Sequence, residues 1–207
     1  MERFGYGIPG ESVQKTTERG QRISASKNPV KLGPSGDVAH HEALHVVASG
    51  GDIVSATIVP DGNSLGTTVP SRLTPAGAAA AAAFGHDGTS WDEFVTVHFL
   101  GVSFRAAKAA ARAELQGKDL EVKAVAGELQ KKKTISKRDV AVAYEKADKV
   151  RKGISEVIII VFDLSGRKKE YREETDKDLE TIIVEFEKDE EKVHQGENKK
   201  EDLTLAA

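Results

Sequence analysis

One pentapeptide constrains the fold of this 207-residue chain more than any other feature. Residues 41–45 read His-Glu-Ala-Leu-His, so two imidazoles lie four positions apart. Residues with that spacing share one face of an α-helix, where His41 and His45 can both reach a single metal ion. The pattern therefore predicts a helix in this segment and a zinc ion bound by the two histidines.

Glu42 is predicted to be the catalytic residue of this motif. We expect it to lie beside the metal without binding to it, where its carboxylate can accept a proton from a water molecule that zinc has made acidic. The alternative is that His41 and His45 are ordinary helix residues satisfied by hydrogen bonds, because isolated matches to so short a pattern also arise by chance.

The composition restricts both ligands and partners. The chain has no cysteine, which excludes disulfides, thiolate zinc sites and cysteine nucleophiles and leaves histidine and carboxylate as the strong zinc ligands. A formal net charge of -3 gives no reason to expect binding to nucleic acid or to an anionic membrane. The chain also lacks an apolar run long enough to cross a bilayer, and its first ten residues do not have the pattern of a secretory signal. We expect a soluble, cytoplasmic protein.

Between residues 35 and 153 the pattern predicts one mainly helical domain. The metal-binding helix is expected to begin near residues 35–37 and to end at Gly50 and Gly51, where a positive φ angle is tolerated. A β-hairpin should follow, with strands at 54–59 and 65–69. Further helices are predicted from their caps and glycine stops at 74–85, from Ser90 in a capping box with Glu93, and at 103–116, 119–131 and 136–152.

The two ends of the chain have different patterns. Residues 1–34 show little apolar periodicity and are predicted to form a flexible N-terminal arm. The β-forming runs 157–162 and 181–186 predict a small β lobe over residues 154–188. The Lys- and Glu-rich tail at 189–207 is expected to be disordered or a frayed helix.

Four short blocks of the chain, taken in order, resemble the protease domain of the FtsH-type zinc metallopeptidases. The blocks are residues 39–45; residues 55–60 with Gly62, Leu65 and Gly66; Ala76 and Gly77; and residues 88–92. In that family the HExxH helix is followed by a strand, a glycine turn, an alanine-rich helix and a segment that delivers an aspartate ligand. The resemblance covers about residues 37–116 and implies an α+β fold, namely a mainly helical, zincin-like peptidase domain with a short hairpin.

The resemblance implies that Asp92 is the third zinc ligand, beside His41 and His45, while the fourth position stays open for water. As an alternative, Asp92 is a first-turn carboxylate that stabilises its helix dipole and binds no metal. Glu93 is the neighbouring competitor, although we expect it to act in the capping box. The further candidates are His40, which points about 100° around the helix from His41, and His86, Asp87 and His98.

The predicted function is that of a zinc-dependent endopeptidase. Residues 54–59 are expected to receive an extended polypeptide by edge pairing, unless the fold itself covers that edge. Because the chain has no GxxxxGK[ST] loop, we expect no ATPase module, so that the substrate is an unfolded or flexible polypeptide. The alternative is a non-catalytic structural or assembly protein, for example a virion component, that retains a peptidase-like fold. A zinc hydrolase acting on other bonds also stays open, and the resemblance allows a homo-oligomer or a larger assembly.

Overall fold

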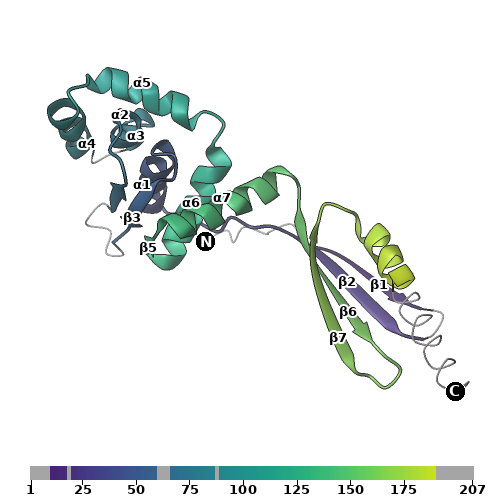
Figure 1. The fold of residues 1–207 in the computed structure, drawn as a ribbon. Coiled ribbons are helices and arrows are strands. Elements are labelled where there is room, and N and C mark those ends of the chain that lie inside the picture. Colours follow the sequence, from purple (N-terminus) through teal and green to yellow (C-terminus); the bar gives the residue numbers. More distant parts are fainter. Residues whose placement is uncertain (1–9, 18–19, 60–65, 87–88, 190–207) are drawn as a thin grey trace, which may run out of the picture. The chain divides into compact units, whose positions relative to one another are not determined.

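The computed structural model describes residues 10–17, 20–59, 66–86 and 89–189, and the chain divides into two compact units. Residues 31–151 form one of them, here called the helical unit. The described parts of 1–30 and 152–207 form the other, here called the sheet unit. The protein is α+β, with a separate small sheet in each unit (Figure 1).

Helix α1 (Asp37–Ala48) is the centre of the helical unit (Figure 1). It contacts α2, α3, α5 and α6 as well as strands β3 and β4. Its small side chains at Ala39 and Ala43 are fully buried, which lets several neighbours approach the helix closely. The other helical segments are α2 (Pro75–Ala78), α3 (Ala80–Ala83), α4 (Ser90–Phe94), the π-helical η1 (Val95–Phe99), α5 (Phe104–Leu115), α6 (Asp119–Lys132) and α7 (Lys137–Arg151).

The helix ends test the predictions from capping residues. Gly50 and Gly51 end α1 with φ angles of 70° and 74°, as predicted. Thr74 caps α2 by accepting a hydrogen bond from the amide of Gly77. The predicted capping box at Ser90 is wrong, because α4 has Thr89 at its N-cap without a side-chain cap bond and Ser90 is already its first residue.

An antiparallel three-stranded sheet in the order β4-β3-β5 completes the helical unit. It is formed by β3 (Ile53–Thr57), β4 (Thr67–Pro70) and β5 (Thr134–Ile135). The predicted hairpin is confirmed, and its turn at 60–62 lies outside the described residues. The expectation that residues 54–59 offer a free edge is wrong, because β4 and β5 pair with the two sides of β3. Among the strands that the structure describes, β4 lies at the edge of this sheet.

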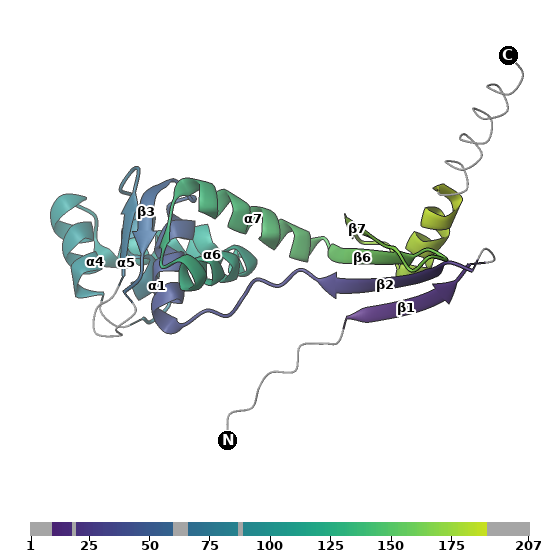
Figure 2. The same cartoon turned by 90° about the horizontal axis from the view of Figure 1, so that it is seen from below.

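The sheet unit combines strands from distant parts of the chain. Its antiparallel sheet has the order β1-β2-β6-β7, formed by β1 (Glu11–Thr16), β2 (Arg22–Pro29), β6 (Ser155–Phe162) and β7 (Lys168–Thr175). A helix over residues 179–189 packs on the sheet (Figure 2). Its residues Leu179, Ile182 and Ile183 share one core with Ile23, Ala25, Val157, Ile159 and Val161.

Two sequence predictions fail in the sheet unit. Residues 11–16 and 22–29 of the predicted flexible arm are strands, because β2 buries Ile23 and Ala25 when it pairs with β6. The predicted strand at 181–186 is part of the helix over 179–189, which begins where the carboxylate of Asp178 accepts hydrogen bonds from the amide and the hydroxyl of Thr181. The predicted C-terminal lobe therefore includes N-terminal strands, and its tail from residue 190 lies outside the described residues.

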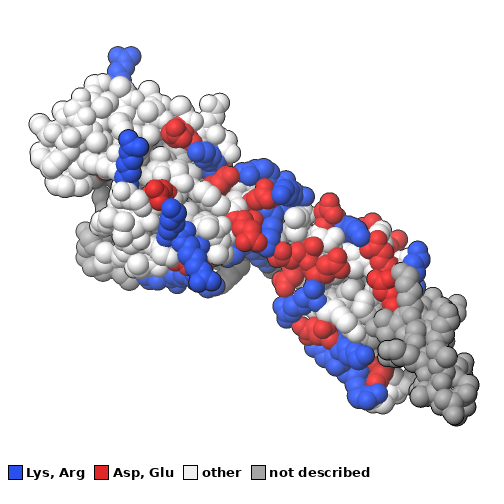
Figure 3. All heavy atoms as spheres, in the orientation of Figure 1, with Lys and Arg blue, Asp and Glu red and all other residues white. Residues whose placement is uncertain are grey.

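The described surface is uneven in charge. Figure 3 shows few charged side chains over α2–α5 and many over the sheet unit. Among the described helices, none combines the length and the apolarity that crossing a membrane would require.

Candidate metal centre

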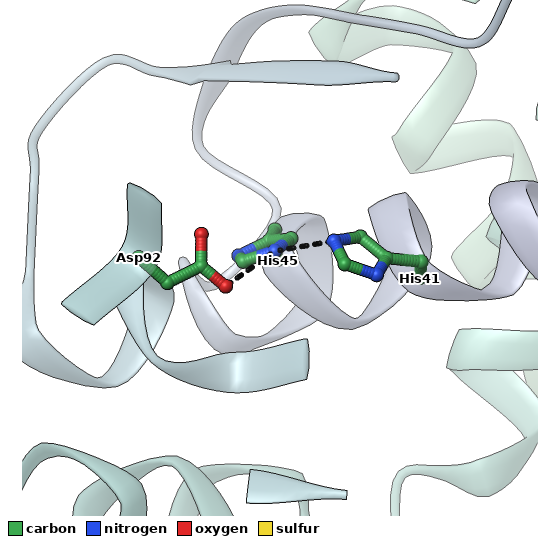
Figure 4. A group of neighbouring side chains, drawn as sticks. All are labelled: His41, His45 and Asp92. Carbon is green, nitrogen blue, oxygen red and sulfur yellow. Dashed lines mark hydrogen bonds and ion pairs between the residues drawn. The ribbon is translucent and has the colours of Figure 1, made fainter. Parts of the chain in front are cut away.

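Helix α1 places the three residues of the pentapeptide together. His41 and Glu42 are buried, with exposed fractions of only 5% and 3%. One helical turn further on, the Nε2 atom of His45 lies 3.3 Å from the Nε2 atom of His41 (Figure 4). The two imidazoles therefore point their Nε2 atoms at a shared space, as their spacing in the sequence predicts.

Asp92 reaches the same space from α4. Its Oδ2 atom lies 3.6 Å from Nε2 of His45, and the ligand atoms of His41, His45 and Asp92 all lie within 4.8 Å of one another (Figure 4). Donors bound to tetrahedral zinc are about 3.3–3.5 Å apart, given bond lengths of about 2.0–2.2 Å. The three side chains thus have a spacing that a zinc ion could draw together with small movements.

The chemistry of Asp92 fits a cation. Its Oδ2 atom is buried and has no hydrogen-bond partner among the described residues, since the 3.6 Å separation from Nε2 of His45 exceeds hydrogen-bonding distance. Burial raises the pKa of this carboxyl group to about 7. An unpartnered buried carboxylate oxygen is costly, and a bound divalent ion removes that cost by supplying the missing opposite charge.

The environment of each histidine ring bears on metal binding. Burial, followed by the neighbouring rings of His45, His86 and His40, lowers the pKa of His41 to about 4, so this ring is neutral at pH 7. His45 approaches the carbonyl oxygen of Gly77 at 2.7 Å with its Nδ1 atom. A carbonyl can only accept, so Nδ1 carries a proton, and in the neutral ring the lone pair that could bind a metal is on Nε2.

Gly77 holds α2 close to α1. A Cβ atom at this position would lie 2.4 Å from Oγ of Ser49, so a side chain here would push the two helices apart. The glycine therefore allows its carbonyl group to orient His45. Gly77 belongs to the family resemblance, but the sequence predicts no role for it, because a backbone acceptor leaves no signal in residue type.

Glu42 lies beside the three donors and is not one of them. Burial raises the pKa of its carboxyl group, and the hydroxyl of Thr68 opposes this shift by donating a 2.6 Å hydrogen bond to Oε2. A bound cation would favour the ionised form further. The geometry thus offers an acceptor for a proton next to a place for a metal ion. Thr68 is a second residue that sequence analysis missed.

The other candidate ligands do not join this group. His40 contacts His86, with 3.2 Å between Nδ1 and Nε2 and with stacked rings. His98 packs against the ring of Phe94, and Glu93 is exposed. The remaining candidate, Asp87, lies outside the described residues.

The donors line a pocket of about 230 Å³ within the helical unit. Residues of the edge strand β4, including Thr67 and Thr68, line it together with Trp91 and Val95. Trp91 is 66% exposed and stacks on Phe94. The pocket therefore combines a polar centre, a free strand edge and apolar side chains.

Searches of protein-family models, of curated proteins and of solved structures find no match for this chain. The candidate site therefore rests on its residues and their geometry.

Proposed function

We propose that this protein is a zinc-dependent endopeptidase and that its helical unit is a zincin-like domain related to the FtsH-type peptidases. One observation carries the proposal: His41, His45 and Asp92 converge on one space, and the Asp92 carboxylate has a buried oxygen without a partner. An ordinary hydrogen-bonded helix pair accounts for neither the convergence of the third residue nor the missing partner.

His41, His45 and Asp92 would hold the ion, and each residue has a defined task. When bound, zinc supplies a Lewis acid that polarises a carbonyl group and acidifies water. Glu42 takes the proton of the attacking water on its carboxylate and returns it to the leaving amine. The Gly77 carbonyl keeps the His45 ring in the tautomer that leaves Nε2 unprotonated.

The substrate would be an extended polypeptide lying along β4. This strand is at the edge of its sheet, and residues 66–68 line the pocket that holds Glu42. Backbone pairing at a strand edge tolerates many side-chain sequences but requires an unfolded or flexible segment. Such a substrate agrees with the absence of an ATPase motif from the chain.

The decisive experiment is the substitution Glu42→Gln, assayed on casein and on a flexible peptide. We expect cleavage to fall by about 10²–10⁴-fold, the usual contribution of a general acid or base, while zinc content stays at one ion per chain. Glu93→Gln is the matched control, because it neutralises an exposed carboxylate next to Asp92 and should leave cleavage unchanged.

Equal cleavage by Glu42→Gln and wild type would refute the assigned role. Zinc binding without cleavage of any unfolded polypeptide would instead favour the alternative of a non-catalytic assembly protein with a structural ion.

A further inference from the structure

The carboxylate of Glu42 is held in one place by strand β4. The hydroxyl of Thr68 donates a 2.6 Å hydrogen bond to Oε2 of Glu42 and lies 3.4 Å from the backbone oxygen of the same residue. The length of 2.6 Å is typical of a hydroxyl bound to an ionised carboxylate, the stronger class of hydrogen bond.

Gly66, which immediately precedes β4, leaves space for the side chain of Glu42. A Cβ atom built at this position would lie 2.3 Å from the backbone oxygen of Thr57, 2.5 Å from Cγ of Glu42 and 2.9 Å from Cδ of Glu42. A side chain at position 66 would therefore clash both with the backbone of β3 and with the side chain of Glu42. The hydroxyl of Thr68 binds the carboxylate of Glu42. Gly66, two positions earlier in the chain, leaves space for the same side chain.

The support for Thr68 is itself rigid. Thr68 pairs with Ala56 in the β3–β4 ladder, and Ala56 is fully buried. A β-branched side chain in a strand has few χ1 rotamers, so the ladder determines where the hydroxyl points. Glu42, in contrast, has a long side chain whose position depends on its partners.

We propose that Thr68 on β4 and Gly66, just before β4, form a cradle that positions Glu42 for proton transfer, with Thr68 as the positioning residue. The catalytic meaning of this cradle rests on the proposed peptidase function, whereas the contact itself does not. Because β4 also offers the free edge for an extended substrate, one strand would place both the peptide and the base that acts on it.

The first test measures the contact without any activity. Thr68→Val should lower the urea midpoint of unfolding in the wild-type background but much less in the Glu42→Ala background, since the lost hydrogen bond needs both partners. Thr57→Val is the matched control: it removes another threonine hydroxyl from the same sheet, one that contacts Thr134 instead of Glu42. Its effect should be the same in both backgrounds.

The second test measures catalysis. Thr68→Val should lower kcat by about 10–100-fold, because a misplacement of about 1 Å costs up to about 100-fold, with KM and zinc content nearly unchanged. Thr68→Ser keeps the hydroxyl and should recover most of kcat. Gly66→Ala should lower kcat in the same way as Thr68→Val, whereas Thr57→Val should leave it unchanged.

The two tests separate this inference from the proposed function. Equal effects of Thr68→Val in both backgrounds, or a kcat no better in Thr68→Ser than in Thr68→Val, would overturn the cradle even in an active enzyme. If the wild-type protein cleaves nothing, the proposed function fails, and the cradle has no catalytic role. The urea midpoints would still show whether Thr68 and Glu42 interact.

Discussion

The helical unit and the sheet unit bury different kinds of residue. Within the described residues, the buried ionisable side chains are His41, Glu42 and Glu128, and all of them belong to the helical unit. The buried polar residues of the sheet unit are Ser155 and Thr175, which face each other in the β6–β7 ladder and carry no charge. Burying a charge is costly, so proteins place such groups where they have a task. The contrast assigns the chemistry to the helical unit.

The two cores also differ in side-chain size. Alanines fill much of the core of the helical unit, whereas isoleucine and valine dominate that of the sheet unit. Small side chains allow backbones to approach each other, and the approach of α2 to α1 lets the carbonyl of Gly77 reach His45. Close helix packing is thus part of the candidate metal centre, whose three ligand residues all belong to the helical unit.

The largest expected effect is on zinc binding, which should depend on the helical unit and not on the sheet unit. His45→Ala should reduce zinc content from one ion per chain to none. Removing a residue that only orients a ligand should cost less, about 10–100-fold in zinc affinity. Zinc should slow amide hydrogen exchange in α1 and α4 of the wild type, because a ligand stabilises the structure that binds it, and should leave β6 unchanged. His98→Ala is the control. Zinc-dependent protection of β6 would break the comparison.

The next effect is on stability alone. Ile159→Ala removes a side chain that is 3% exposed in the sheet unit, and we expect the free energy of unfolding of that unit to fall by about 2–5 kcal/mol. Zinc affinity should stay as in the wild type. Val184→Ala, at a position 43% exposed, should cost little. Denaturant unfolding followed by zinc titration checks both statements, and a large loss of zinc affinity would contradict the division of tasks.

A third effect concerns packing around the metal centre. Gly77→Ala places a Cβ atom against Ser49 and should weaken zinc binding by about 10–100-fold, as expected when the orienting partner of a ligand moves. Competition with a zinc chelator measures the change. Adding Ser49→Ala removes the nearest clashing atom and should recover part of the affinity. No recovery in the double variant would show that another contact decides the spacing of α1 and α2.

The smallest effect is a pH dependence. Burial acts to raise the pKa of Glu128, but the hydrogen bond and the charge of Lys146, together with the charge of Lys132, outweigh it and lower the pKa below its ordinary value of 4.5. A lowered pKa means that this ion pair stabilises the fold above pH 4.5 and that the stabilisation is lost as the pH falls through the lowered value.

Glu128 is buried, but its partners Lys132 and Lys146 are 41% and 36% exposed, so solvent screens the pair and Glu128→Gln should cost at most about 1 kcal/mol at pH 7. The cost should disappear once the pH lies below the lowered pKa. Urea midpoints of unfolding, measured at pH 7 and at a pH below the lowered pKa of Glu128, test this cost. Glu114→Gln is the exposed control. A cost that persists in acid would show that shape, and not charge, decides the contribution of Glu128.

Local patterns predicted the helical unit well. The spacing of His41 and His45 and the glycines after α1 depend on neighbours in the sequence, so short windows contain the information. The placement of Asp92 came from the family resemblance, and its proximity to His45 agrees with that expectation.

What failed in prediction depends on distant partners. β2 is a strand because β6, more than a hundred positions away, pairs with it and covers Ile23 and Ala25. The sequence predicts a strand at 181–186, although Leu179, Ile182 and Ile183 also have helical spacing, and packing against the sheet decides between the two. The roles of Thr68 and the Gly77 carbonyl likewise exist only once α1, α2 and β4 have come together.

The pairing of β2 with β6 determines the order in which the protein can assemble. Pro29 and Ser155 are opposite each other in that ladder, so the helical unit is inserted between two strands of one sheet. On a ribosome, residues 31–151 emerge before β6 exists, and β1 and β2 must wait for it as an unfinished hairpin. The last strands to be synthesised complete a structure begun by the first, whereas residues 31–151 include the helices and strands that pack around α1.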